Sequence, residues 1–384
     1  MILGPLQKAG SKINQNFYIQ MNSKNHYLAD VDNAIHHLRR GATVVVDDLV
    51  RCLAVVSVEL LTQESLDAFC MSSKGKVQLI VTGNRLQALG LNVSSQHAHS
   101  VVHPGAFNLE LISLLTNPLA SATAPSNLKE HLNLLSVHEA DFFAQSCLNL
   151  SKLARLLPAV LVAEMPNTGS LPCVSPAFIN AYASHAANAL SLVSEARVPL
   201  ESVENARVLA FRPQHGGVEH LAIVIGDIDT LSPVLIRLHS ECFTGDLLGS
   251  LRCDCGGQLR GAVDVMVKNG SGILLYLAQE GRGIGLVNKL RAYQLQDVGH
   301  DTVDANLQLG FDADERNYCA AVAMLQRMGV SKVKLMTNNP TKVKALSALG
   351  VEVTERVPHA YPANPHNEHY LKTKVEKSGH LISI

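Results

Sequence analysis

The segment after residue 203 constrains the fold more than any other part of this 384-residue chain. Three runs rich in aliphatic and β-branched residues, ARVLAFR, HLAIVIGDI and PVLIRLHSECF, predict successive strands. The next run, GQLRGAVDVMVKNG, has helical spacing and ends at Gly270, and GILLYLAQ then predicts another strand. The final third continues the alternation, for example with YCAAVAMLQRMG before VKLMTN. These patterns predict a mixed α and β (α+β) domain over residues 204–384.

The first half of the chain predicts a second mixed α and β domain. DVDNAIHHLRRGATVVVDDL indicates a capped helix that ends at Gly41 and a buried strand over residues 42–46, and GKVQLIVTG indicates a further strand. We expect a surface loop over residues 120–135 and one helix over residues 177–196. Because a chain of this length is too long for one ordinary core, we expect two domains. The predicted divisions are an extension, 1–29, and domains over 30–203 and 204–384.

Composition and charge argue against several classes of protein. The formal net charge is −1, so no overall field draws the chain to nucleic acid or to a membrane surface. The N-terminal residues MILGPLQKAGSKINQNF lack the basic and apolar segments of a signal peptide. The longest apolar run, LSKLARLLPAVLVAEM, is interrupted by Lys152, Arg155 and Pro158 and is too polar to span a bilayer. We expect a cytoplasmic protein whose thiols are free for chemistry or for metal binding.

Cys242, Cys253 and Cys255 form the most unusual cluster in the sequence. The C-x-C spacing is too tight for an unstrained disulfide and lacks the two intervening residues of the usual redox motif. Three thiolates without an obvious fourth ligand suit a catalytic zinc ion, which keeps one tetrahedral position for water. Since free cysteine is also often buried as a small apolar residue, spacing alone supports zinc and simple packing equally. Packing is the better interpretation for the other cysteines, which are Cys52, Cys70, Cys147, Cys173 and Cys319.

Three later segments have features of an anion site. GRGIG follows a strand and opens a helix near Gly285, where backbone amides favour phosphate, although such a turn is often only a tight connection. MTNNPTKVKAL places Lys342 in the first turn of a helix, an unfavourable position for a cation unless an anion is bound. FDADERNY puts Asp314 and Arg316 close together, which on an exposed face is an ordinary charged run. Together with the cysteines, these segments indicate a zinc enzyme that acts on a phosphorylated small molecule.

The second half of the chain contains the motifs HSECFTGDLLGSLRCDCGGQL, LAQEGRGIGLVNKLRAYQLQDVGHDTVDANLQLGF, DADERNY and LMTNNPTKV, in that order. Together they resemble GTP cyclohydrolase II of riboflavin biosynthesis, and the resemblance runs from about residue 205 to NEHYLKTKVEKSGHL. It implies hydrolysis of GTP to 2,5-diamino-6-(5-phospho-ribosylamino)pyrimidin-4(3H)-one, with release of formate and diphosphate. It also implies a Zn²⁺ ion in each subunit, Mg²⁺ with the GTP triphosphate, and a homodimer.

The same resemblance implies roles for individual residues. It implies that the three clustered cysteines bind zinc, that Asp314 acts as a base and Arg316 as a nucleophile, and that Tyr293 lies close to the reacting ring. Because a guanidinium stays protonated well above neutral pH, stabilisation of charge at the α-phosphate is the alternative role for Arg316. The implied GTP contacts are Arg237, Leu238, His239, Ser240, Glu241, Gln258, Glu280, Gly281, Arg282, Thr302, Thr337 and Lys342.

Residues 30–200 show a weaker resemblance to 3,4-dihydroxy-2-butanone 4-phosphate synthase, in AIHHLRRGATVVVDD, HPGAFNLEL and LPAVLVAEMPNTGS. Where the synthase has an acidic run, this chain reads DDLVRCLAVV, which keeps Asp47 and Asp48 but loses the later acids. Residues 143–145, FAQ, replace the catalytic H-T-E of the synthase. Without the acidic cluster there is no Mg²⁺ site to stabilise an enediolate. We expect a degenerate, catalytically silent domain; the alternatives are a bifunctional enzyme and a non-catalytic zinc- or nucleotide-binding protein.

Overall fold

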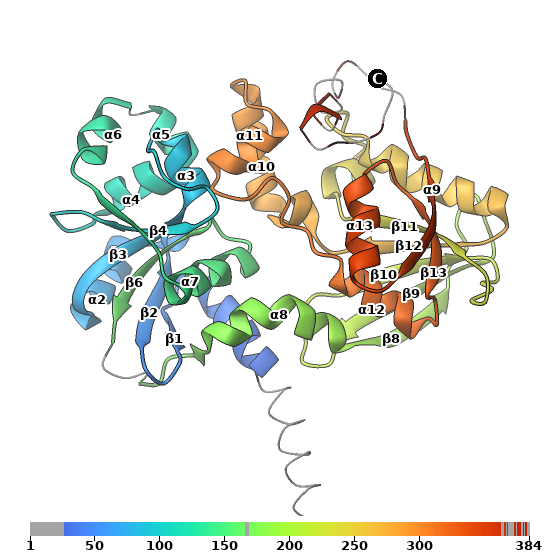
Figure 1. Cartoon of the computed structure of the whole chain (residues 1–384), viewed down its shortest axis with the longest axis horizontal. Coiled ribbons are helices and arrows are strands. Elements are labelled where there is room, and N and C mark those ends of the chain that lie inside the picture. The colour runs from blue at the N-terminus through green and yellow to red at the C-terminus, as the bar shows by residue number, and fades with distance from the viewer. Residues whose placement is uncertain are drawn as a thin grey trace, which may run out of the picture.

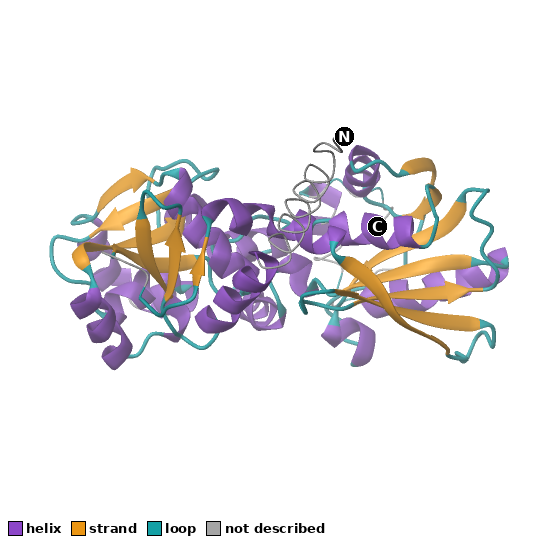
Figure 2. Cartoon of the chain, turned by 90° about the horizontal axis from the view of Figure 1, so that it is seen from below, coloured by secondary structure: helices purple, strands orange, loops and turns teal. Residues whose placement is uncertain are grey.

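The computed structural model describes residues 27–123, 125–165 and 169–361, and part of the segment 362–384. Each half of the chain is built on its own seven-stranded sheet, and helices lie between the two sheets (Figure 1 and Figure 2). Both halves are therefore mixed α and β, as the sequence predicts. Within the described residues, no helix combines the length and the apolar character that crossing a membrane requires.

The first sheet is antiparallel except for one short parallel pair, between β1 and β7. Both of its faces are covered, because Leu53 and Val55 of β2 lie in one apolar core while Ala54 and Val56 lie in another. In spatial order its strands are β5 (Ser136–Glu139), β4 (Ala98–Val102), β3 (Lys74–Thr82), β6 (Ala159–Glu164), β2 (Cys52–Ser57), β1 (Val44–Asp47) and β7 (Cys173–Val174).

Helices cover both faces of this sheet. A helix over residues 27–38 and α7 (Phe142–Leu153) contribute to the core on one face. The predicted helix before Gly41 and the predicted strands that correspond to β1 and β3 are thus confirmed. The opposite face is covered by α2 (Gln63–Ser72), α3 (Gly83–Ala88) and α4 (Leu109–Thr116).

Two predictions for the first half are wrong. The expected loop over residues 120–135 contains α5 (Pro118–Thr123) and α6 (Pro125–Leu132). Proline fits the first position of a helix, so each proline here begins a helix instead of marking a loop. The expected helix over residues 177–196 is α8 (Pro176–Asn188) followed by β8 (Leu190–Arg197). The backbone of β8 pairs with a neighbouring strand, β9, and this long-range pairing overrides the local helical pattern.

The second sheet joins a parallel part to an antiparallel part. The strands β14, β13, β11 and β12 are parallel, and β12, β10, β9 and β8 are antiparallel. Its first strand, β8, precedes the domain boundary expected near residue 203. In spatial order the strands are β14 (Glu352–Val357), β13 (Lys332–Met336), β11 (Val234–Ser240), β12 (Gly272–Leu277), β10 (His220–Ile225), β9 (Ala206–Pro213) and β8.

Helices cover the second sheet on both faces and connect it to the first half. One core involves α9 (Cys255–Asn269), and the other involves α8, α12 (Cys319–Arg327) and α13 (Pro340–Ala348). Between the halves lie α10 (Leu286–Asp297) and α11 (Thr302–Gln308) (Figure 1). There, Leu295 and Ala305 share an apolar cluster with Leu157 of the first half. Because β11, β12 and β13 are parallel, their carboxyl ends meet at one edge of the sheet, where ligand sites commonly form.

Candidate active site

A pocket at the carboxyl ends of β11, β12 and β13 collects the residues that the sequence predicts for function. Every predicted zinc ligand and every predicted GTP contact lines this pocket, together with Tyr293 and Arg316. Asp314 does not line it but forms an ion pair with Arg316. The structure therefore brings together side chains that lie more than a hundred positions apart in the sequence, such as Arg237 and Lys342.

The three clustered cysteines come from different local structures and meet at one end of the pocket. Cys242 follows β11, Cys253 lies in the turn before α9, and Cys255 is the first residue of α9. Their sulfur atoms lie within 4.8 Å of one another, with 3.8 Å between Sγ of Cys242 and Sγ of Cys253. Zn–S bonds of about 2.3 Å in a tetrahedron place two sulfurs roughly 3.8 Å apart, so the cluster fits a zinc ion.

The glycine at position 245 allows this close approach of the sulfurs. Gly245 lies in a short π-helical turn, Phe243–Leu247, that begins directly after Cys242. A Cβ atom at this position would lie 2.8 Å from Sγ of Cys253 and 3.0 Å from Sγ of Cys242. These distances are shorter than ordinary packing contacts, so any larger residue would displace the sulfurs. Single π-helical turns are frequent at functional sites, which agrees with this position.

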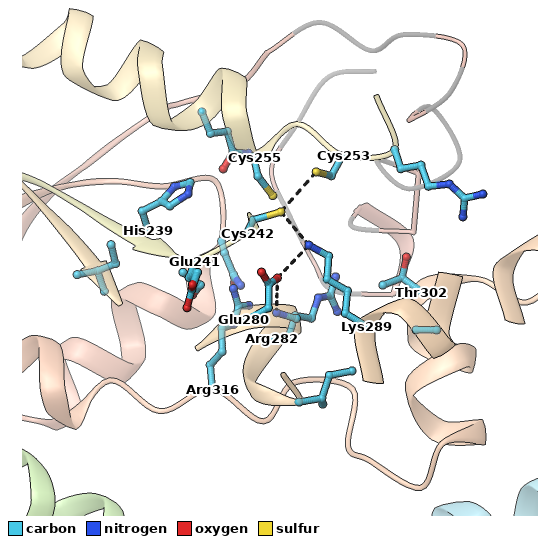
Figure 3. A pocket seen from close by; sticks show the side chains of 18 of the residues that line it. His239, Glu241, Cys242, Cys253, Cys255, Glu280, Arg282, Lys289, Thr302 and Arg316 are labelled. Carbon is cyan, nitrogen blue, oxygen red and sulfur yellow. Dashed lines mark hydrogen bonds and ion pairs between the residues drawn. The ribbon is translucent and has the colours of Figure 1, made fainter. Parts of the chain in front are cut away.

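Lys289 of α10 lies against the cysteine cluster, and Figure 3 shows Cys242 between Cys253 and Lys289. Nζ of Lys289 donates to Sγ of Cys242 at 3.0 Å and to Oε1 of Glu280 at 2.9 Å. Hydrogen bonds from Cys253 and Cys255, together with the ammonium of Lys289, hold the pKa of the Cys242 thiol well below its usual range. The arrangement therefore favours a thiolate, which is the form that binds a metal. The contact between Lys289 and the cysteines was not predicted from the sequence.

Asp246 organises the same corner of the pocket and was not predicted as a site residue. Its carboxylate lies 3.0 Å from Nε2 of His239 and accepts hydrogen bonds from the backbone N of Cys242 at 2.9 Å and the hydroxyl of Tyr276 at 3.0 Å. Burial lowers the pKa of His239, although Asp246 acts in the opposite direction. Asp246 thus fixes a predicted zinc ligand, Cys242, and a predicted GTP contact, His239. Its position four residues after Cys242, inside a motif of the resemblance, was the available signal.

A buried arginine, Arg237, also lines the pocket. Nη1 of Arg237 donates to the backbone O of Met336 at 2.9 Å, and Nη2 contacts Oε1 of Gln258. The Nε atom of Arg237 has no hydrogen-bond partner within the part of the chain that the structure describes. Burial lowers the pKa of Arg237 to about 10, so the group stays cationic at neutral pH. A buried donor without a partner at a pocket wall suits a polar ligand atom.

Thr337 and Lys342 lie where β13 passes into α13. Nζ of Lys342 donates to the backbone O of Leu238 at 3.2 Å, and Oγ1 of Thr337 accepts from the backbone N of Asn339 at 3.0 Å. His359 also lines the pocket, and burial together with the positive charge of Arg237 lowers its pKa to about 4. His359 and Asn339 are pocket residues that were not predicted. Asn339 lies inside the motif LMTNNPTKV, which was the available signal, whereas His359 lies outside the motifs of the resemblance.

Arg316 and Asp314 form a bidentate pair in the segment between α11 and α12. Nε of Arg316 donates to Oδ1 of Asp314 at 2.8 Å, and Nη2 contacts Oδ2. Burial raises the pKa of Asp314, but the hydrogen bond and charge of Arg316 outweigh burial and hold this pKa below its usual value. Arg282 packs on the same segment by donating to the backbone O of Ala313 at 3.1 Å. Arg282 and Arg316 thus line the pocket, and the carboxylate of Asp314 is paired with Arg316.

Tyr293 and Thr302 line the side of the pocket formed by α10 and α11. The hydroxyl of Tyr293 lies 3.4 Å from Oγ1 of Thr244, and the guanidinium of Arg252 lies 5.0 Å from the Tyr293 ring centroid. Oγ1 of Thr302 accepts from Nε2 of Gln296 at 3.2 Å. Since Thr244 is also bound by Lys289 at 3.0 Å, Tyr293 is linked to the cysteine cluster through one hydroxyl.

The first half does not gather the catalytic groups of a synthase among its described residues. The positions that follow Asp47 and Asp48 lead into β2, whose Leu53 and Val55 are buried in the core. Phe143 and Ala144, in place of the expected histidine and threonine, lie on the buried side of α7. In the described part of the chain, the three clustered cysteines are the only group of three or more His, Cys, Asp or Glu side chains that could hold a metal ion.

Comparisons with known proteins agree with the geometry of the pocket. Residues 191–358 match the model of the family described as GTP cyclohydrolase II. The chain is 45% identical over 363 residues to a GTP cyclohydrolase-2 of Azospirillum brasilense, across 92% of this chain and 94% of the relative. It is 35% identical over 399 residues to the riboflavin biosynthesis protein RibBA of Synechocystis, across 92% of this chain and 71% of that protein.

One solved structure also resembles the chain, although loosely. It is RibBX, a two domain 3,4-dihydroxy-2-butanone 4-phosphate synthase from A. baumannii, with a TM-score of 0.31 and 14% identity. The match covers 86% of this chain and 99% of that one.

Proposed function

Because the chain belongs to the GTP cyclohydrolase II family of riboflavin biosynthesis, we propose that it opens the imidazole ring of GTP in a zinc-dependent hydrolysis. The proposed products are 2,5-diamino-6-(5-phospho-ribosylamino)pyrimidin-4(3H)-one, formate and diphosphate. One observation carries the proposal: three cysteine sulfurs lie within 4.8 Å of one another in a pocket that Arg316 and Lys342 also line. A metal site and a cationic site for phosphates are thus combined in one cavity.

Cys242, Cys253 and Cys255 hold the zinc ion in this proposal. Bound zinc supplies Lewis acidity and lowers the pKa of a water molecule beside C8 of the guanine ring. Lys289 offsets the excess negative charge of three thiolates through its contact with Cys242 at 3.0 Å. Glu241 lies next to Cys242 and lines the pocket, and burial and the nearby Glu280 raise its pKa. Because Glu241 directly precedes Cys242 and lines the same pocket, we assign to its carboxylate the role of accepting and returning a proton.

Arg316 stabilises the charge that develops at the α-phosphate. The bidentate contact with Asp314 favours the protonated guanidinium, and the lowered pKa of Asp314 makes this carboxylate a poor acceptor for the proton of Arg316. Both effects oppose a nucleophilic role for Arg316. Intact-mass measurement during turnover is expected to show no guanylyl adduct on the protein, and an adduct lost in Arg316→Lys would instead establish the nucleophile.

The pocket lining suits a triphosphate and a purine. Arg282, Arg316 and Lys342 provide the positive charge, and Arg237 presents a buried Nε without a described partner. Outside the cysteine cluster, the described residues contain no group of three metal-ligating side chains, so Mg²⁺ in this proposal is held mainly by the phosphates and water. Magnesium commonly binds in this way in enzymes that act on nucleotides.

The first half is catalytically silent in this proposal. The support is the burial of Ala54 and Val56 where the synthase carries acids, and of Phe143 and Ala144 where it carries catalytic polar groups. We also propose a homodimer. Its structural support is one exposed apolar turn beside the cysteine cluster, formed by Leu247, Leu248 and Leu251. A single mass near 41.3 kDa in light scattering, which is the mass of one chain, would exclude the dimer.

One experiment tests the main proposal. Purified full-length chain loaded with Zn²⁺ and supplied with Mg²⁺ and GTP is expected to release formate and diphosphate in equal amounts and to form a diaminopyrimidine. The same preparation is expected to leave ribulose 5-phosphate unchanged. Absence of formate from protein with a full complement of zinc would exclude the cyclohydrolase activity. Conversion of ribulose 5-phosphate to a dihydroxybutanone phosphate would show that the enzyme is bifunctional.

A further inference from the structure

The segment that carries the proposed catalytic residues has a second side, which contacts the first half of the chain. Residues 278–316 line the pocket with Glu280, Arg282 and Arg316. On the other side, Nη2 of Arg155 donates to the backbone O of Ala278 at 2.7 Å, and Nδ2 of Asn288 donates to the backbone O of Arg155 at 3.0 Å. The first half is thus bonded to the strand end and to the helix that flank the pocket.

Lys152 of the first half forms an ion pair with Glu315, the residue directly before Arg316. Lys152 lies in the last turn of α7, and its Nζ contacts Oε1 of Glu315 at 2.7 Å and Oδ2 of Asp312 at 3.1 Å. The side chains of Lys152 and Glu315 are only 18% and 19% exposed, so solvent screens their interaction weakly. Glu315 stands directly between Asp314 and Arg316 in the sequence.

Contacts outside regular secondary structure hold the backbone around Glu315. Residues 312–318 form neither helix nor strand. Glu315 holds this stretch at two points, because its Oε1 accepts from the backbone N of Asp312 at 2.9 Å and its backbone N donates to the backbone O of Arg282 at 3.0 Å. A charge held at Glu315 therefore fixes the local path of the chain that presents Asp314 and Arg316 to the pocket.

A second anchor holds the start of the same stretch. Nδ2 of Asn84 donates to the backbone O of Phe311 at 3.1 Å and to Oδ1 of Asp312 at 3.0 Å. Arg85, which is 1% exposed, donates from Nη1 to the backbone O of Gln308 at 3.2 Å. Both residues belong to α3 of the first half. Two separate elements, α3 and α7, thus hold the stretch from Gln308 to Glu315.

We propose that the first half of the chain acts as a scaffold for the catalytic segment, and that Lys152 is a positioning residue that places the Asp314–Arg316 pair through Glu315. The inference rests on the roles proposed above for Arg316 and Asp314. In this proposal the catalytically silent first half contributes to the reaction by holding the catalytic residues of the second half in place. Displacement of a catalytic group by about 1 Å can lower a rate by up to two orders of magnitude, so a contact outside the pocket has a measurable effect on kcat.

The test compares variants of the full-length chain in GTP turnover. Lys152→Met removes the charge and keeps most of the side-chain volume, Lys152→Arg keeps the charge, and Glu315→Gln removes the partner charge. Lys129→Met is the matched control, because Lys129 is an exposed lysine of α6 in the same half. Zinc content and the melting temperature are measured for each variant, so that loss of metal or of folded protein is separated from loss of positioning.

Lys152→Met is expected to lower kcat about tenfold, with the KM for GTP changed less than about twofold and with one zinc ion still bound. Lys152→Arg is expected to restore at least half of the kcat, and Lys129→Met to match the wild type. In the double variant Lys152→Met/Glu315→Gln, the two losses are expected to be less than multiplicative, because both changes remove the same contact.

Two results overturn the inference while leaving the cyclohydrolase activity in place. One is an active wild type with a Lys152→Met variant whose kcat differs from that of Lys129→Met by less than twofold. The other is a fall in kcat that only follows the loss of zinc or of folded protein and that Lys152→Arg does not reverse. If the wild type itself releases no formate, the proposed cyclohydrolase activity is wrong. That result is distinct from either of the two that overturn the role of Lys152.

Discussion

Nζ of Lys289 donates to Sγ of Cys242 at 3.0 Å and to Oε1 of Glu280 at 2.9 Å, so one ammonium connects the cysteine cluster to the wall of the pocket. Glu280 also accepts from the backbone N of Phe243 at 2.6 Å, in the turn that begins after Cys242. The cation therefore stabilises a thiolate and at the same time holds the segment that positions it. Contacts of this type around metal ligands commonly tune metal affinity.

Replacing Lys289 with methionine is expected to lower the affinity for zinc by about tenfold, because Cys242 loses the positive charge that stabilises its thiolate. Competition with a chromogenic zinc chelator measures this affinity directly. Lys268→Met is the control, since Lys268 is an exposed lysine in the last turn of α9. Equal zinc affinities in the two variants would show that Lys289 does not tune the site.

Cys253→Ser is expected to remove zinc from the purified protein and to lower GTP turnover by at least about a hundredfold, because serine is a poor zinc ligand and only two thiolates remain. Cys173→Ser is expected to keep both properties near the wild-type values, since Cys173 is exposed in β7. Elemental analysis of zinc and formate release are measured on the same samples. Similar losses in both variants would favour a packing role for the cysteines.

The cysteine cluster could be predicted from sequence because its members are all of one residue type and lie within fourteen positions of one another. The strands β9 to β13 could be predicted because each is rich in aliphatic residues. Asp246 could not, because its role depends on Tyr276, which only the fold brings to 3.0 Å. The pair of Lys152 with Glu315 spans 163 positions and has no local pattern at either end.

The errors in the fold have the same physical origin. The segment at β8 has a helical pattern, but Leu192 pairs with Phe211 of β9, a partner that the local sequence does not reveal. The helices α5 and α6 each begin at a proline, a residue that marks either a loop or the first turn of a helix according to its surroundings. Local patterns were reliable where burial and propensity agreed, and failed where pairing with distant segments decided the structure.

Gly245→Ala is expected to lower zinc occupancy and GTP turnover by about tenfold or more. The new Cβ would lie 2.8 Å from Sγ of Cys253 and 3.0 Å from Sγ of Cys242, so the sulfurs must separate from the spacing that tetrahedral zinc requires. Gly257→Ala is the matched control, because a Cβ there meets only ring carbons of Tyr361 at 3.8 Å. Zinc content after dialysis distinguishes the two, and full occupancy in Gly245→Ala would contradict the steric argument.

His220 of β10 predicts how stability depends on pH. Its Nδ1 accepts from the backbone N of Ala278 at 3.1 Å, and burial together with the positive charge of Arg155 lowers its pKa from 6.5 to about 4. Between these values the unfolded chain binds the proton more readily, so this residue's stabilising contribution is complete above pH 6.5 and declines as the pH falls towards 4.

The variant His220→Asn tests this dependence, because asparagine does not titrate in this range. Between pH 7.5 and pH 5.5 the wild type is therefore expected to lose on the order of 1 kcal/mol more of its free energy of unfolding than the variant. Urea unfolding followed by circular dichroism at both pH values measures this difference. The exposed His185 provides the control, and His185→Asn is expected to behave as the wild type. Equal losses in the wild type and in His220→Asn would show that His220 takes up its proton as readily in the folded protein as in the unfolded chain.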